Sequence, residues 1–360
     1  MQPATLRGLR TGALYERDQP PFSPRHHLSK RPERAAAPGD PVMEGWSGRV
    51  DPSVSGDARR WHQVVRAVET SAPPGVVMLG FACDEGIRRN GGRVGAAAGP
   101  VALRSMLSNL PVLNESPLYD AGDVACGDGD LEGAQWRFAE RIAQALDAGH
   151  VPVGLGGGHE IAFATYQGLA RHLLVNGKQR YSKPRVAIIN LDAHFDLRKQ
   201  EQGSSGTPFL QAIEHAAQHG LALEYFCLGV SASANTRQLF STADEHAVYY
   251  RHDDELTLLS LSQQIEALQS RLKSVDVIHL SICLDVLPAA MAPGVSAPSA
   301  RGMPMEVIEP LLAAIAATGK IAVMDVAELS PPFDRDNSTA RVAARLIHRV
   351  THAIERAKSA

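Results

Sequence analysis

The feature that most constrains the fold is an alternation of short apolar runs with longer segments of helical periodicity, which begins near Trp61 and continues to the end of the chain. This alternation predicts parallel strands joined by helices. The expected strands span residues 75–81, 118–124, 151–155, 185–191, 223–229, 247–250, 275–284 and 321–326. The expected helices span residues 100–110, 135–148, 161–174, 208–219, 256–272, 305–317 and 339–357.

The pattern is compatible with two α/β architectures, an eight-stranded barrel and an open sheet with helices on both faces. A chain of 360 residues, 44% of them apolar, is long enough for either. Residues 1–45 are rich in proline and lack apolar periodicity, so we expect them to form a mobile tail. The remainder, residues 46–360, is expected to form a single catalytic domain.

The amino-acid composition argues against nucleic-acid and membrane partners. Lysine and arginine number 36 against 39 aspartates and glutamates, a net charge of −3, which provides no basic field for nucleic acid. No apolar run approaches the roughly 20 residues that span a bilayer. The four cysteines form no CxxC pair, so we expect reduced thiols. A cytoplasmic protein with a small-molecule substrate and no membrane or nucleic-acid partner is the expectation.

Polar side chains that can carry chemistry follow four of the expected strands. In parallel α/β folds the carboxyl ends of the strands meet at one edge, and active sites form there. The four clusters are His159 and Glu160 in GGGHE, Asp192, His194 and Asp196 in DAHFD, Cys283 and Asp285 in SICLD, and Asp325 and Glu328 in DVAE.

The DAHFD segment points most directly to a metal. If the strand continued through it, Asp192, His194 and Asp196 would share one face, and two carboxylates so close favour a bound cation. A polar strand end or a lone loop histidine explains any single cluster equally well. Together, the clusters offer enough ligands for two ions, and an oxygen-dominated set favours Mn²⁺. Two such ions activate water for hydrolysis.

The motifs GGGHE, NLDAHFD, SICLDVLPAAMAPGVSAP and DVAELSPP resemble the signature blocks of the ureohydrolases, the arginase and agmatinase superfamily. The segment GIRRNGGRVGAAAGP also resembles the N-terminal loop block of that superfamily. The resemblance implies a three-layer α/β/α fold with a parallel eight-stranded sheet, two Mn²⁺ ions per chain and a homo-oligomer. It further implies hydrolysis of a guanidino or amidino carbon–nitrogen bond.

Carried over motif by motif, the resemblance assigns metal ligands and catalytic groups. One ion would be bound by His159, Asp192 and Asp196, and the other by Asp192, His194 and Asp285. Cys283 stands where most members have a bridging aspartate, and it is either a thiolate ligand or an unligated small side chain. Glu328 would bind the cationic amidine, and Asp196 would move a proton to the leaving nitrogen.

The substrate is indicated by the segments that surround these motifs. GSSGTPF lacks the histidine of arginase-like members, and with Arg198 it resembles the branch that hydrolyses N-formimidoyl-L-glutamate to glutamate and formamide in histidine degradation. Arg198 suits a substrate carboxylate, with Arg88, Arg89 and Arg93 as further candidates. A guanidino hydrolase of agmatinase or guanidinobutyrase type, and a non-catalytic binding protein with the same fold, are the alternatives.

Overall fold

The computed structural model describes residues 45–52, 57–113, 115–175 and 183–359. These residues form one sheet of nine parallel strands in the order β1-β3-β2-β4-β9-β8-β5-β6-β7. The strands are β1 (Arg66–Ala67), β2 (Val76–Ala82), β3 (Leu118–Ala125), β4 (Val151–Leu155), β5 (Arg185–Leu191), β6 (Ala222–Val230), β7 (Tyr249–His252), β8 (Val277–Cys283) and β9 (Ile321–Ala327).

The three-layer α/β/α class with an open parallel sheet is confirmed, and the barrel alternative is excluded. All eight expected strands are present among the described residues, but the count of eight was one too low. The additional strand, β1, has two residues and pairs with β3 at the edge of the sheet. Both of its residues are exposed, so they leave no apolar pattern in the sequence.

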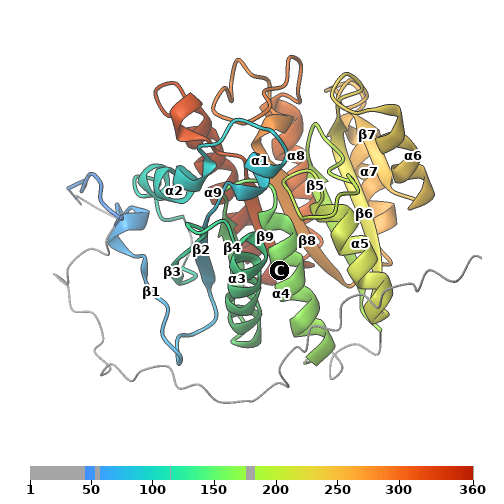
Figure 1. Ribbon diagram of the computed structural model, residues 1–360. Coiled ribbons are helices and arrows are strands. Elements are labelled where there is room, and N and C mark those ends of the chain that lie inside the picture. The colour runs from blue at the N-terminus through green and yellow to red at the C-terminus, as the bar shows by residue number, and fades with distance from the viewer. Residues whose placement is uncertain (1–44, 53–56, 114, 176–182, 360) are drawn as a thin grey trace, which may run out of the picture. The chain divides into compact units, whose positions relative to one another are not determined.

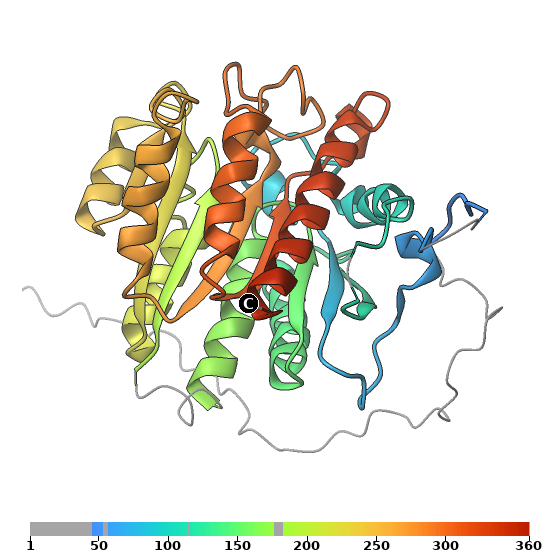
Figure 2. The ribbon, with the colours of Figure 1, turned by 180° about the vertical axis from the view of Figure 1, so that it is seen from behind.

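Helices cover both faces of the sheet. Helices α3, α4 and α5 lie on the face toward the viewer in Figure 1, and α7, α8 and α9 lie on the face seen in Figure 2. The helices of the described residues are α1 (Glu85–Arg89), α2 (Gly99–Leu107), α3 (Leu131–Asp147), α4 (Ile161–Val175), α5 (Pro208–His219), α6 (Arg237–Glu245), α7 (Leu261–Leu272), α8 (Met305–Ala316) and α9 (Ser338–Ser359).

The central strands are largely apolar because they are covered on both faces. Every residue of β4 and β8 is buried. The sheet order places β4, β9, β8 and β5 next to one another, and these are the four strands that the polar clusters follow. The fold therefore brings the four clusters to one edge.

The predicted proline-rich tail, residues 1–45, lies outside the described residues except for Gly45. It stays a prediction. Among the described residues, no helix combines the length and the apolar character that crossing a bilayer requires.

Candidate metal and substrate site

The candidate metal ligands lie at the carboxyl ends of β4, β5 and β8 and in the loops that follow these strands. Cys283 is the last residue of β8, and Asp285 lies in the short 3₁₀ turn after it, Leu284–Val286. Strand β5 ends at Leu191, so the DAHFD residues lie in the loop beyond it rather than on a continuing strand. The alternation argument therefore does not apply to them, but the loop still brings Asp192, His194 and Asp196 together.

Two residues at this edge of the sheet have backbone conformations that residues other than glycine rarely adopt. Asp196 has φ of +49° and Glu328 has φ of +75°. Left-handed backbone at a non-glycine residue costs free energy and is concentrated at functional sites. Both residues line the same pocket, so the strain is located where the chemistry is expected.

The potential ligand atoms form two groups that share Asp192. His159, Asp192 and Cys283 each offer one ligand atom within 4.8 Å of the others, and so do Asp192, His194 and Asp285. His159 Nδ1 lies 3.0 Å from Asp192 Oδ2 and 2.9 Å from Asp196 Oδ2. His194 Nδ1 lies 3.1 Å from Asp285 Oδ2. The arrangement provides two adjacent sites for cations.

A buried hydrogen-bond chain orients the His159 ring. Ser281 Oγ donates to Asp325 Oδ1 at 2.6 Å, so its lone pair accepts from His159 Nε2–H at 3.0 Å. The other Asp325 oxygen lies 2.6 Å from His279 Nε2. A cation bound between Nδ1 and the carboxylates would leave the ring neutral with its proton on Nε2, and the ring is already turned so that Nδ1 faces that position. Sequence analysis did not assign Ser281, although SICLD contains it.

The charges at this edge fit a cation. Burial lowers the pKa of His159, but Asp192 and Asp196 outweigh it and raise the pKa well above its usual value. Burial and the charge of Asp192 together raise the pKa of Asp196 to about 6. His159 Nδ1 and Asp285 Oδ1 are buried and make no hydrogen bond among the described residues, although Nδ1 has the two carboxylate oxygens within ion-pair distance. The site thus attracts positive charge and holds donor atoms that a metal ion would satisfy.

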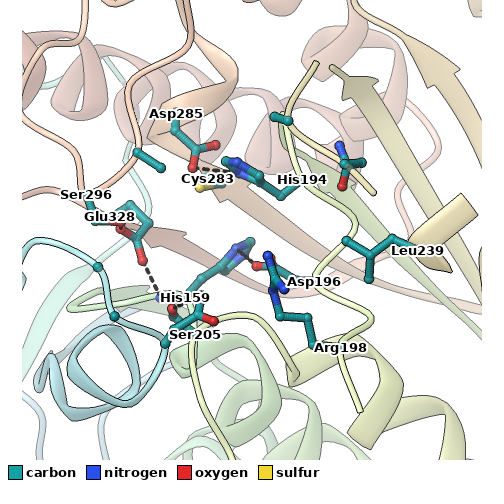
Figure 3. A pocket seen from close by; sticks show the side chains of 16 residues that line it. His159, His194, Asp196, Arg198, Ser205, Leu239, Cys283, Asp285, Ser296 and Glu328 are labelled. Carbon is teal, nitrogen blue, oxygen red and sulfur yellow. Dashed lines mark hydrogen bonds and ion pairs between the residues drawn. The ribbon is translucent and has the colours of Figure 1, made fainter. Parts of the chain in front are cut away.

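The ligand groups open into a pocket of about 190 Å³ (Figure 3). Glu328 stands on one side of it, where its carboxylate accepts hydrogen bonds from the backbone N–H of His159, at 3.0 Å, and from Ser296 Oγ–H. Burial raises the pKa of Glu328 to about 7. Arg198 lies beside Asp196, away from Asp285. The remaining wall includes Asn90 and Ser205, two residues for which the sequence motifs predicted no role.

The four candidate arginines differ in what they contact. Arg88 is paired with Glu85, and Arg89 with Glu85 and Glu132. Arg93 donates to the Ser296 carbonyl oxygen and lies over the Phe333 ring. Arg198 is exposed, lines the pocket and has no acidic partner among the described residues. Of the four, Arg198 is the one that lines the pocket of the candidate site.

The family of the chain follows from this fold and site together with sequence comparison. The model of the arginase family matches residues 74–352, which include every strand but β1. The chain belongs to the arginase family, and the resemblance inferred from the motifs is confirmed.

Within this family, the chain is similar to proteins named formimidoylglutamase or formiminoglutamase. The chain is 52% identical over 317 residues to the formimidoylglutamase of Ralstonia nicotianae, covering 88% of this chain and 96% of the relative. It is similar in structure to the Trypanosoma cruzi formiminoglutamase solved with Mn²⁺, with a TM-score of 0.69 and 25% identity over 82% of this chain and 98% of that one. The Bacillus subtilis formimidoylglutamase shares the fold, with a TM-score of 0.72 and 21% identity over 85% and 96% of the two chains.

Proposed function

We propose that this protein hydrolyses N-formimidoyl-L-glutamate to L-glutamate and formamide, using two Mn²⁺ ions held at the carboxyl edge of the sheet. The observation that carries the proposal is the pair of ligand groups that share Asp192 and open into a pocket containing both Glu328 and Arg198. The high identity to a formimidoylglutamase supports the same substrate. The resemblance that suggested this activity from the motifs agrees with both.

The ligands follow from the two groups. His159, Asp192 and Cys283 form one group, and Asp192, His194 and Asp285 form the other. Asp196, whose Oδ2 lies 2.9 Å from His159 Nδ1, is a further candidate ligand of the first position. Imidazole nitrogens and carboxylate oxygens form a set that suits Mn²⁺, and the T. cruzi relative was solved with that metal. When bound, Mn²⁺ neutralises these carboxylates and supplies an activated water for hydrolysis.

The remaining residues bind and orient the substrate. Glu328 pairs with the cationic amidine and turns its electrophilic carbon toward the ligand groups. Arg198 pairs with a substrate carboxylate on the opposite side of the pocket. Asp196, beside His159, accepts a proton from the attacking water and passes it to the departing glutamate nitrogen. The bond between the amidine carbon and the glutamate nitrogen breaks. Formamide leaves with the amidine carbon, the other amidine nitrogen and the oxygen of the attacking water.

The direct test is an assay for formamide and glutamate from N-formimidoyl-L-glutamate, with and without Mn²⁺. We expect Mn²⁺-dependent release of both products. Agmatine has no carboxylate for Arg198 and should release no urea. Urea from agmatine without formamide from formimidoylglutamate would overturn the substrate assignment, and less than one Mn²⁺ per chain without hydrolysis would indicate a binding protein.

The metal ligands have their own test. Asp192→Ala and His194→Ala should each abolish Mn²⁺-dependent hydrolysis, because Asp192 belongs to both ligand groups and His194 to one. Circular dichroism and the unfolding transition should show that the chain remains folded. Full activity in either variant would contradict the two-metal site.

A further inference from the structure

Glu160 directly follows the candidate ligand His159, and the proposed chemistry does not use it. Its side chain is completely buried, and it lies behind the wall of the pocket rather than in it. A carboxyl group at such a position needs a physical reason, because burial of a polar group costs free energy unless its contacts compensate.

The Glu160 carboxyl group is held between two glycines from different segments. Its Oε1 accepts a hydrogen bond of 2.9 Å from the backbone N–H of Gly86, in α1. A Cβ on Gly86 would lie 2.5 Å from Glu160 Oε2, and a Cβ on Gly158 would lie 2.1 Å from it. Only glycine leaves room for the carboxyl group at both places, so the GGGHE loop and α1 are fitted to Glu160.

Further hydrogen bonds link Gly86 to residues that line the substrate pocket. The carbonyl oxygen of Gly86 accepts from the backbone N–H of Asn90 at 3.0 Å. The Asn90 carboxamide donates to Ser205 Oγ at 3.2 Å. Asn90 and Ser205 both line the pocket that contains Arg198. Glu160 is therefore connected to this wall through Gly86 by consecutive hydrogen bonds.

The backbone of Glu160 is fixed independently of its carboxyl group. Gln135, in α3, donates from Nε2 to the Glu160 carbonyl oxygen at 2.8 Å. The preceding residue, His159, is fixed by Ser281 and by its contacts with Asp192 and Asp196. The backbone of Glu160 thus belongs to the loop that carries His159, and its carboxyl group is bonded to Gly86 on the side of the pocket wall.

We infer that Glu160 is a positioning residue that sets the distance between the wall formed by Asn90 and Ser205 and the metal ligands, and so selects substrates with a glutamate-sized group. The inference rests on the proposed function, because it assigns the selectivity of that same pocket. Because this wall and Arg198 line the same pocket, the inference places the substrate's side-chain carboxylate on their side of it and the amidine beside Glu328.

The test compares two substrates in the Mn²⁺-loaded protein. N-formimidoyl-L-glutamate has the side-chain carboxylate, and N-formimidoylglycine keeps the amidine and the α-carboxylate but lacks it. Glu160→Ala should raise KM for the glutamate substrate roughly tenfold, because the Gly86 N–H loses its acceptor. Turnover of the glycine substrate and the Mn²⁺ concentration for half-maximal activity should stay within about threefold of wild type.

Two further variants keep the inference falsifiable. Glu160→Gln retains an oxygen for Gly86 and should restore the selectivity, while Glu160→Asp is too short to reach Gly86 and should lose it even if Glu160→Ala does not fold. Asp120→Asn is the control. It weakens a buried pair with Arg104 away from the pocket, so it should lower stability without changing the ratio of the two substrates.

Equal losses on both substrates in Glu160→Asp, or selectivity as poor in Glu160→Gln as in Glu160→Asp, would overturn the positioning role. Failure of the proposed function would be distinct, because wild-type protein would then not release formamide from N-formimidoyl-L-glutamate.

Discussion

Cys283 is the residue at which this chain differs from the aspartate pattern of its superfamily, and its surroundings limit what its sulfur can do. It is buried and belongs to the ligand group of His159 and Asp192. Burial raises the pKa of the thiol well above its usual value, and the nearby carboxylates raise it further. A thiolate at this position therefore depends on a neighbouring cation, which favours the charged form.

Two substitutions separate a ligand from a bystander at position 283. Cys283→Asp should lower the Mn²⁺ concentration needed for half-maximal activity, because carboxylate oxygen suits Mn²⁺ better than sulfur. Cys283→Ala should raise it if the sulfur binds the metal. The measurement is a Mn²⁺ activation titration of both variants and wild type. Coincident curves would place Cys283 outside the coordination sphere.

Arg198 is the second residue whose role can be measured. Arg198→Ala should raise KM by roughly ten- to a hundredfold, the loss of a charge-assisted contact of about 1.5–3 kcal/mol. Arg198→Lys should recover part of the loss. Arg88→Ala is the matched control, because Arg88 pairs with Glu85 outside the pocket. Unchanged kinetics in Arg198→Ala would show that other groups bind the carboxylates.

Sequence alone was more informative about the candidate metal ligands than about the candidate substrate contacts. His159, Asp192 and Asp285 follow buried strands, so strand order and burial bring them together. Arg198 was ranked ahead of Arg88 because it lies two residues beyond a metal-ligand candidate, but the pairing of Arg88 with Glu85 was not predicted. Asn90 and Ser281 were missed because their hydrogen-bond partners lie far away in the chain.

At the scale of elements, the buried strands were predicted well because apolar residues dominate each of them. The prediction of the helices was less complete. Helix α6 was missed because it is short and polar, with only Leu239 and Ala243 buried, and α7 begins at Leu261 rather than at residue 256.

The three glycines of GGGHE indicated a tight backbone, and their contacts explain it. Gly156 and Gly157 join the ends of β2, β4 and β9.

This junction predicts a large difference between two glycine substitutions. A Cβ on Gly157 would lie 1.9 Å from the Cys83 carbonyl oxygen, so Gly157→Ala should destabilise the fold by about 1–3 kcal/mol and lower activity. Gly127→Ala is the control, because no atom lies within 4 Å of its Cβ position. Urea unfolding measures both. Equal midpoints would mean that the loop can move apart without cost.

At the scale of the whole molecule, the candidate metal ligands lie at the carboxyl ends of β4, β5 and β8, so binding of an ion there would be coupled to folding. Carboxylates gathered at β5 and β8 repel one another until a cation neutralises them. Ligand binding to the folded state alone stabilises it by RT ln(1 + [L]/Kd), about 2.7 kcal/mol at a hundredfold excess over Kd. The unfolding temperature should therefore report metal binding without any substrate.

We predict that saturating Mn²⁺ raises the Tm of the metal-free protein by on the order of 5 °C, and that chelation reverses the change. Asp192→Asn is the matched variant. It keeps the size of the side chain and an oxygen for the His194 backbone N–H, which donates to Asp192 at 2.7 Å, but it removes the charge that both ligand groups share. Its Tm should not respond to Mn²⁺. An equal shift in this variant would place the bound metal elsewhere, and no shift in wild type would contradict the proposed metal site.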